Sequence, residues 1–181
     1  AKVTDKPMAA AVHSNVGLMH ATMAIFDAWC DRAPVMVFGA TGPVDAALRR
    51  PWIDWIHTSR DQGALVRDYV KWDDQPGSPE AAIESVLRAN RIMRRHPQGP
   101  VYIVLDVAMQ ESKLDPVPEI PDVARYAVEP DPAPTTESVT AALEMLKSAT
   151  SPLIMVGRVS RKQADWDRRV AFVEALGANV I

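Results

Sequence analysis

The sequence predicts an α/β fold in which a parallel sheet is covered by helices. Short apolar runs alternate with longer segments of helical periodicity along the 181 residues. The runs are continuous rather than alternating, as is typical of strands buried on both faces. Hydrophobic residues make up 48% and charged residues 24% of the chain, an ordinary globular composition. Since strands that alternate with helices pair in parallel through right-handed crossovers, we expect a Rossmann-like three-layer arrangement.

The first predicted elements are a strand, a helix and a second strand. Residues 8–12 (MAAAV) are expected to form a short buried strand. Residues 16–31 have helical periodicity with apolar side chains on several sides, which predicts a helix buried over most of its surface. Pro34 interrupts this pattern, and the apolar residues 35–38 then predict a second strand that ends at Gly39.

The middle of the chain is less regular before it returns to a clear helix and strand. We expect a short helical or irregular piece at 51–57, a helix at 63–69 and a short strand at 69–72. Ser78 followed by Pro79 is a strong helix start, with Ser as the cap and Pro at the first helical position. The inner stripe of this helix is predicted to be Ile83, Val86, Leu87 and Met93, and its last turns carry Arg88, Arg91, Arg94 and Arg95. These arginines are interpreted as a solvated face that complements the helix dipole. Residues 101–105 (VYIVL) predict the clearest strand.

The composition changes between residues 114 and 134, where six of the 15 prolines lie among acidic residues. Such a segment is typical of an extended linker. After it we expect a helix capped by Thr135 or Thr136, a strand at 153–156, a helix closed by Gly177, and a strand at 179–181. The sequence thus predicts two partial domains, 1–113 and 135–181, joined by the linker 114–134. The basic residues at 158–162 are interpreted as a surface turn rather than a phosphate site.

Charge and cysteine content exclude several classes of protein. The formal net charge of −3 favours neither nucleic acid nor an anionic membrane as a partner. No apolar run approaches the roughly 20 residues that span a bilayer. No signal segment is recognised, so a cytoplasmic location is expected. Cys30 is the single cysteine, which excludes internal disulfides and a cysteine-cluster metal site, and it is interpreted as a packed thiol.

A polar elbow joins the first predicted strand to the first helix, in the stretch VHSNVGLMHATMAIFDAWCDRAPVMVFGATGP. This stretch resembles the pyrimidine-binding domain of thiamine-diphosphate-dependent enzymes, the group of acetolactate synthase, benzoylformate decarboxylase and pyruvate decarboxylase. In acetolactate synthases the pattern is S-G-P-G-x-x-N followed by a helix that ends D-A-Y/W. The matching residues here are Ser14, Gly17, Asp27, Ala28 and Trp29. The pair His13-Ser14 is similar to the opening of the elbow in benzoylformate decarboxylases.

Three later segments extend the resemblance over essentially the whole chain. DQGALVRDYVKW resembles the family's D-x-x-G/A-L-V-R-x-x-x-K-W segment, and QGPVYIVLDV the strand that closes the pyrimidine-binding domain. SPLIMVGRVSR resembles the first strand of the central domain. The resemblance therefore implies that 1–113 is the C-terminal part of a pyrimidine-binding domain and that 135–181 begins the central domain.

The resemblance implies a fragment of a thiamine-diphosphate-dependent 2-oxo acid decarboxylase or carboligase. Its substrate would be a small 2-oxo acid, its cofactors thiamine diphosphate and Mg²⁺, and its partner a second copy in a homodimer or homotetramer. The family's catalytic glutamate is expected upstream of Ala1, and the G-D-G…N motif that holds diphosphate and magnesium does not occur in the sequence. We therefore expect a chain that supplies part of the pyrimidine pocket and of the dimer interface and is inactive alone.

The resemblance also assigns site residues. His13 matches an active-site histidine and would exchange protons with the substrate carbonyl oxygen; the alternative is that its ring bonds the elbow backbone. Ser14, Asn15, Gly17 and His20 are assigned to cofactor binding, and no metal ligand is assigned. Ser14 is also expected to cap the following helix, and His20 departs from the family's Asn.

Other features leave alternatives open. The Phe-Gln-Glu of acetolactate synthases is replaced here by His57-Thr58-Ser59, which argues against acetolactate synthesis. Trp52, Trp55 and Trp72 are interpreted as core or subunit packing rather than a binding groove. The alternative function is a non-catalytic α/β module for oligomerisation or nucleotide binding. No G-x-G-x-x-G follows a strand, so a dinucleotide-binding domain is disfavoured.

Overall fold

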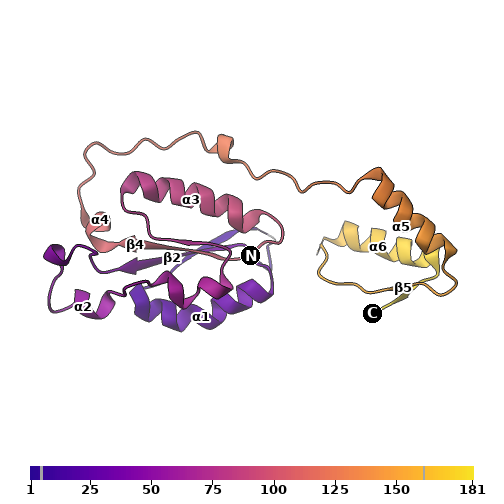
Figure 1. The fold of residues 1–181 in the computed structure, drawn as a ribbon, viewed down its shortest axis with the longest axis horizontal. Coiled ribbons are helices and arrows are strands. Elements are labelled where there is room, and N and C mark those ends of the chain that lie inside the picture. Colours follow the sequence, from indigo (N-terminus) through magenta and orange to yellow (C-terminus); the bar gives the residue numbers. More distant parts are fainter. Residues whose placement is uncertain (5, 161) are drawn as a thin grey trace. The chain divides into compact units, whose positions relative to one another are not determined.

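The computed structural model describes residues 1–4, 6–160 and 162–181 (Figure 1). Arg161, within the basic turn predicted at 158–162, lies outside the described residues. The chain divides into two compact units, Ala1–Asp131 and Pro132–Ile181, and the boundary falls inside the segment predicted as a linker. That segment contains one 3₁₀ turn, η4 (Val123–Tyr126).

The first unit contains a four-stranded parallel sheet, which confirms the predicted fold class. Its strands are β1 (Met8–Ala11), β2 (Val35–Thr41), β3 (Asp73–Asp74) and β4 (Val101–Asp106), in the order β1-β2-β4-β3. All three pairings are parallel. The two long strands therefore occupy the centre, where continuous apolar sequence can be buried on both faces.

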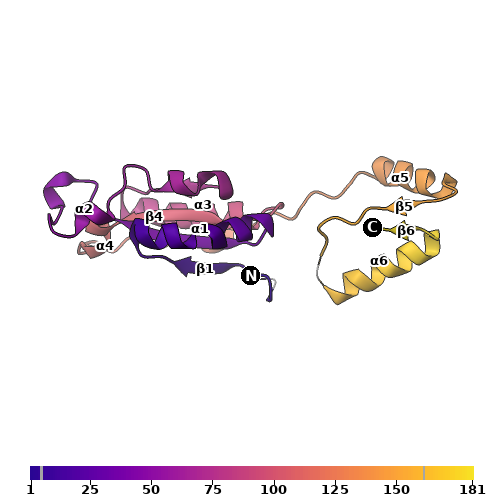
Figure 2. The same cartoon turned by 90° about the horizontal axis from the view of Figure 1, so that it is seen from below.

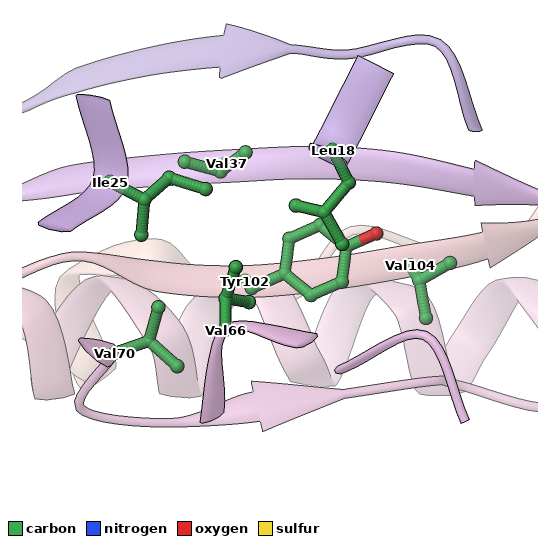
Figure 3. Packing of buried hydrophobic residues seen from close by; sticks show 7 residues of the cluster. All are labelled: Leu18, Ile25, Val37, Val66, Val70, Tyr102 and Val104. Carbon is green, nitrogen blue, oxygen red and sulfur yellow. The ribbon is translucent and has the colours of Figure 1, made fainter. Parts of the chain in front are cut away.

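Two long helices cover opposite faces of this sheet (Figure 1). On one face, Leu18 and Ile25 of α1 (Ser14–Cys30) pack against Tyr102 and its neighbours, the cluster shown in Figure 3. On the other face, Ala89 and Met93 of α3 (Pro79–Arg94) pack with the alternate strand residues Met36, Val101 and Ile103. Successive side chains of a strand point to opposite faces, so β2 and β4 serve both clusters.

The start of α3 confirms the predicted cap. The Ser78 hydroxyl accepts a hydrogen bond from the backbone N–H of Ala81 at 3.1 Å, and Pro79 is the first helical residue. Two predicted inner residues, Leu87 and Met93, are buried, whereas Ile83 and Val86 are partly buried.

Three predictions about burial are wrong. All four residues of β1 are exposed, because β1 is an edge strand and its residues after Met8 are alanines that fill little space (Figure 2). The helix α1 is buried along one side only. Its other side carries the exposed residues Val16, Met19, Met23 and Phe26. We call these four residues the outer stripe of α1. Cys30, predicted as a packed thiol, is also exposed.

The region between α1 and α3 also differs from the prediction. Residues 63–69 form two 3₁₀ turns, η2 (Gly63–Leu65) and η3 (Arg67–Tyr69), instead of one helix. The break lies at Val66, whose φ of −126° and ψ of 1° are outside the helical region. The strand expected at 69–72 is instead β3, because the Arg67 guanidinium pairs with both Asp61 and Asp73 and thereby fixes the entry into β3. Trp52 and Trp55 are exposed, so the prediction that they pack in the core is wrong. Their packing against another subunit stays a prediction.

The second unit consists of α5 (Thr136–Ser148), β5 (Leu153–Ile154), α6 (Gln163–Leu176) and β6 (Asn179–Val180). Thr135 caps α5 as predicted, and Gly177 ends α6 in the left-handed conformation with φ 58°. The strands β5 and β6 pair in parallel and are shorter than predicted. Among the residues that the structure describes, no helix is long and apolar enough to cross a membrane.

Candidate active-site elbow

The elbow lies at the carboxyl end of β1, where the chain turns into α1. Val12 continues the sheet by donating its N–H to the Phe38 carbonyl at 2.8 Å. His13 is the N-cap residue, and its carbonyl accepts from the Gly17 N–H at 2.7 Å, which starts the helix. Ser14 has φ 55°, an uncommon value for a residue with a side chain. Ligands of α/β proteins bind at this edge of the sheet, so the elbow is positioned to contact one.

Ser14 and Asn15 fasten the elbow to the end of α2 (Asp54–His57). Ser14 is 4% exposed, and its hydroxyl lies 2.9 Å from the His57 carbonyl, to which it donates. The Asn15 side-chain amide donates to the Ile56 carbonyl at 3.1 Å, and its oxygen accepts from the Val16 N–H. The prediction that Ser14 caps α1 is wrong, because its hydroxyl bonds α2 instead.

The fastening brings His57 against His13. Their ring centroids are 5.0 Å apart and the ring planes are nearly perpendicular, at 88°. His57 Nδ1 lies 3.1 Å from the Ile53 carbonyl oxygen. Because a carbonyl oxygen only accepts hydrogen bonds, Nδ1 is the donor in this contact. The His13 ring is exposed and makes no hydrogen bond with any described residue, so the predicted alternative bond to the elbow backbone is not formed.

Gly17 and His20 lie differently from the other assigned residues. A Cβ at position 17 would be 3.1 Å from the Val12 carbonyl carbon and 3.2 Å from Val12 Cβ. Glycine therefore lets α1 approach the end of β1, which explains this residue by packing. His20 is exposed further along α1, and no hydrogen bond joins it to the elbow within the described part of the chain. The structure thus brings together His13, Ser14, Asn15 and Gly17, but not His20.

Behind the elbow, α2 is held by a buried carboxylate. Asp54 is 2% exposed and forms an ion pair with Arg50, with Nη2 and Oδ1 3.1 Å apart. Hydrogen bonds from the Arg50 side chain and backbone N–H lower the pKa of Asp54. The Thr58 hydroxyl donates to the Asp54 carbonyl at 2.6 Å, and the Gly42 N–H donates to the His57 carbonyl at 3.1 Å. The His57 carbonyl therefore joins the elbow, α2 and the loop after β2.

A second polar group is buried in the sheet below the elbow. The Gln62 amide donates to Tyr102 Oη at 2.8 Å and to the Ala40 carbonyl at 3.1 Å. Burial raises the pKa of Tyr102 to about 12. A Cβ at Gly39 would lie only 2.0 Å from Tyr102 Oη, so glycine makes the space for this hydroxyl. Two buried oxygens, Thr41 Oγ1 and Gln62 Oε1, have no hydrogen-bond partner among the described residues.

Sequence reasoning gave His57 no role, although it noted that this residue replaces the family's Phe-Gln-Glu. The signal that could have found it is this replacement: an imidazole stands where the acetolactate synthase pattern has a phenylalanine. No cluster of three or more His, Cys, Asp or Glu side chains that could hold a metal occurs in the described ranges. The structure therefore places two imidazoles, His13 and His57, side by side at the carboxyl edge of an α/β sheet.

Comparisons with known proteins identify the scaffold. A protein of Pseudomonas aeruginosa, a probable 2-ketoarginine decarboxylase, is 26% identical over 157 residues, which are 87% of this chain and 27% of that protein. Benzoylformate decarboxylase from Polynucleobacter necessarius is 27% identical with a TM-score of 0.82, covering 98% of this chain and 32% of that one. The thiamine diphosphate-dependent 4-hydroxybenzoylformate decarboxylase of Rhodococcus jostii RHA1 has the same fold, with 23% identity, a TM-score of 0.76 and coverage of 98% and 33%. No family model matches the chain.

Over 87% or more of its length the chain is similar to these decarboxylases, one of which is named as thiamine diphosphate-dependent. It spans 27–33% of the length of the relatives given above, so it corresponds to about a third of such an enzyme.

Proposed function

We propose that this chain forms the elbow side of the active site in a thiamine-diphosphate-dependent lyase or transferase that acts on a small 2-oxo acid. The observation that carries the proposal is the His13 ring, which is open and free of protein hydrogen bonds at the carboxyl end of β1. An imidazole in this state can give a proton to, or take one from, a carbonyl oxygen of the substrate. The relatives support the substrate class, since the names of three of them are those of 2-oxo acid decarboxylases.

The residues present fit a bound cofactor in a limited way. Ser14 and Asn15 have their polar atoms engaged with α2, so they would shape the pocket wall rather than release hydrogen bonds to a ligand. Gly17 keeps α1 close to β1, and His20 offers an exposed ring that could contact the cofactor. We propose that the diphosphate and Mg²⁺ are held by residues outside this chain. When bound, thiamine diphosphate supplies the electron sink for decarboxylation.

In the proposed mechanism, this chain's part is to hold two imidazoles at defined positions. The His57 Nδ1 proton is committed to the Ile53 carbonyl, which fixes the ring and presents Nε2. The perpendicular packing of His57 restricts the His13 ring on one side. His13 would then bind the 2-oxo acid and exchange one proton with its carbonyl oxygen. The two tethers from Ser14 and Asn15 preserve this arrangement during turnover.

We further propose that the outer stripe of α1 forms part of the interface with a second copy, in a homodimer or homotetramer. Met19 and Met23 are 53% and 66% exposed, which is a high exposure for side chains of this size on a regular helix. The same stripe is the feature that favours the alternative function, a non-catalytic module for oligomerisation. Sedimentation of the Met23→Glu variant tests the interface: we expect dissociation, and an unchanged assembly would contradict it.

The function is tested in the protein that contains this chain. We expect release of CO₂ from a 2-oxo acid such as benzoylformate or 2-ketoarginine, dependent on thiamine diphosphate and Mg²⁺. His13→Asn should lower kcat roughly 100-fold and alter the pH profile, since it removes a proton-exchanging group. His96→Asn is the control, because His96 lies outside the elbow and contacts Asp131. Calorimetry should show cofactor binding by the longer protein and none by the 181-residue chain. Absence of thiamine-dependent turnover with any 2-oxo acid would overturn the proposal in favour of the module.

A further inference from the structure

A cavity of about 320 Å³ lies on the side of α3 that faces the end of η4 and the segment after it. Both parts belong to the first unit. Its basic lining consists of Arg88, Arg91 and Arg95, which are spaced three and four residues apart and therefore share one face of the helix. Its volume is within the range of small-molecule sites. The three arginines are exposed, as the sequence predicts. The structure adds the residues on the opposite side of the cavity, Tyr126, Val128 and Glu129.

The charges that line the cavity do not balance. Arg88 pairs with Glu84 at 2.5 Å, and Arg91 pairs weakly with Glu129, with a distance of 3.4 Å between Nη2 and Oε1. The Arg95 guanidinium forms no ion pair or hydrogen bond with another described residue. The three arginines and two glutamates therefore leave the cavity with one uncompensated positive charge.

The remaining lining is apolar or aromatic. Ile92 comes from α3, and Tyr126 and Val128 come from the segment that covers it; all three are partly buried. A ligand in this cavity would thus meet guanidinium groups on one side and a hydrocarbon and ring surface on the other. The helix end itself disfavours an anion, but Arg94, which does not line the cavity, contributes a further cation there.

We propose that this cavity binds a small molecule with one carboxylate and an apolar or aromatic body. The carboxylate pairs with the free Arg95 fork, and Arg91 is a second donor because its bond to Glu129 is long. The body lies against Ile92, Val128 and Tyr126. A single negative charge matches the single excess positive charge, whereas a phosphate dianion would add an uncompensated charge. This site is separate from the elbow and does not depend on the proposed function.

The probe for this proposal is benzoate, compared with benzamide, which has the same shape and no charge, and with inorganic phosphate. Titrations followed by NMR should shift the methyl signals of Ile92 and Val128 without shifting the His13 ring. We expect benzoate to bind at least about tenfold more tightly than benzamide, and more tightly than phosphate, with weakening at high salt. Equal binding of benzoate and benzamide would overturn the proposal, as would shifts centred on the elbow. Stronger binding of phosphate would replace the carboxylate with a phosphate ligand and contradict the charge argument.

Matched variants sharpen the test. Arg95→Gln should weaken benzoate binding roughly tenfold, whereas Arg94→Gln on the same helix end should leave it unchanged. Glu129→Gln should strengthen binding about threefold, because it frees Arg91 and removes a negative charge. All three side chains are exposed, so the fold is retained, which circular dichroism verifies. Equal effects of the Arg95 and Arg94 substitutions would show that the charge of the helix end, and not the cavity, attracts the ligand.

Discussion

The two units of the chain use the same elements with different results. In Ala1–Asp131, strands of seven and six residues pair at the centre of the sheet and bury side chains on both faces. In the described part of Pro132–Ile181, two strands of two residues each accompany α5, which Thr135 caps, and α6, which Gly177 ends, and no residue is buried. Caps and turns therefore suffice to form helices, but a core requires strands long enough to be covered on both sides.

The largest expected effect tests this difference directly. Leu18→Ala in the first unit should lower the free energy of unfolding by about 3 kcal/mol, because the side chain is 0% exposed and its loss leaves a cavity. Leu143→Ala in the second unit, where the side chain is 38% exposed, should cost below about 1 kcal/mol. Native-state hydrogen exchange reports each unit separately. Equal losses would mean that the second unit has a core of its own.

The next effect concerns pH and the centre of the first unit. The pKa of Tyr102 is raised from 10.0 to about 12, so the unfolded chain loses this proton first as the pH rises. The contribution of the raised Tyr102 pKa to the free energy of unfolding is therefore complete below pH 10. It declines by about 2–3 kcal/mol between pH 10 and 12. The Tyr102→Phe variant should be about 1 kcal/mol less stable at neutral pH, because it lacks the hydrogen bond that Gln62 donates to Tyr102. Its stability should not show the decline between pH 10 and 12. In urea unfolding, the unmodified protein should be the more stable of the two at neutral pH and the variant the more stable near pH 12. An equal dependence of both stabilities on pH would refute the raised pKa of Tyr102.

A somewhat smaller effect is expected at Gly39. Alanine there would place its Cβ 2.0 Å from Tyr102 Oη, inside a cluster that has no room to yield. We expect a loss of about 2 kcal/mol in thermal or urea unfolding. The double variant Gly39→Ala with Tyr102→Phe should recover part of this loss, because the ring carbon Cζ would still be close, at 2.7 Å. Simple additivity of the two changes would show that the contact does not cause the loss.

The smallest effect belongs to the second unit and is purely local. Gly177→Ala should destabilise α6 by about 1 kcal/mol, since φ is 58° and no atom lies within 4 Å of the new Cβ. Gly157→Ala is the control, because its Cβ also meets nothing and its φ is not positive. Circular dichroism, which measures the loss of helix on unfolding, should show a destabilised helix in the Gly177→Ala variant and no change in the Gly157→Ala variant. A change in the first unit's exchange rates would contradict a local effect.

Local signals explain which parts of the fold the sequence could predict. The caps at Ser78 and Thr135 and the αL glycine at 177 depend on a few neighbouring residues, and all three are confirmed. The parallel sheet follows from the alternation of apolar runs with helices. The turns at 63–69 were missed because an ion-pair network, Arg67 with Asp61 and Asp73, overrides helix periodicity there.

The elbow shows the same limit at the level of the site. Its location and the place of His13 at its start could be predicted, but neither the open state of the His13 ring nor the neighbouring His57 could. That contact depends on a hydrogen bond between residues 43 positions apart, from Ser14 to the carbonyl of His57. The exposed outer stripe of α1 was missed for a related reason: periodicity identifies apolar positions, but only the sheet decides which of them are covered.

The bond from Ser14 also places different demands on its two partner positions. It holds position 57 by a main-chain oxygen, which every amino acid possesses. Substitution of His57 therefore changes the chemistry that faces His13 and leaves the tether in place. Ser14, with its positive φ, is the costly member of the pair: glycine would suit its backbone better but would have no hydroxyl to donate. The side chain at position 57 can thus change without loss of the tether, whereas the tether requires a hydroxyl at position 14.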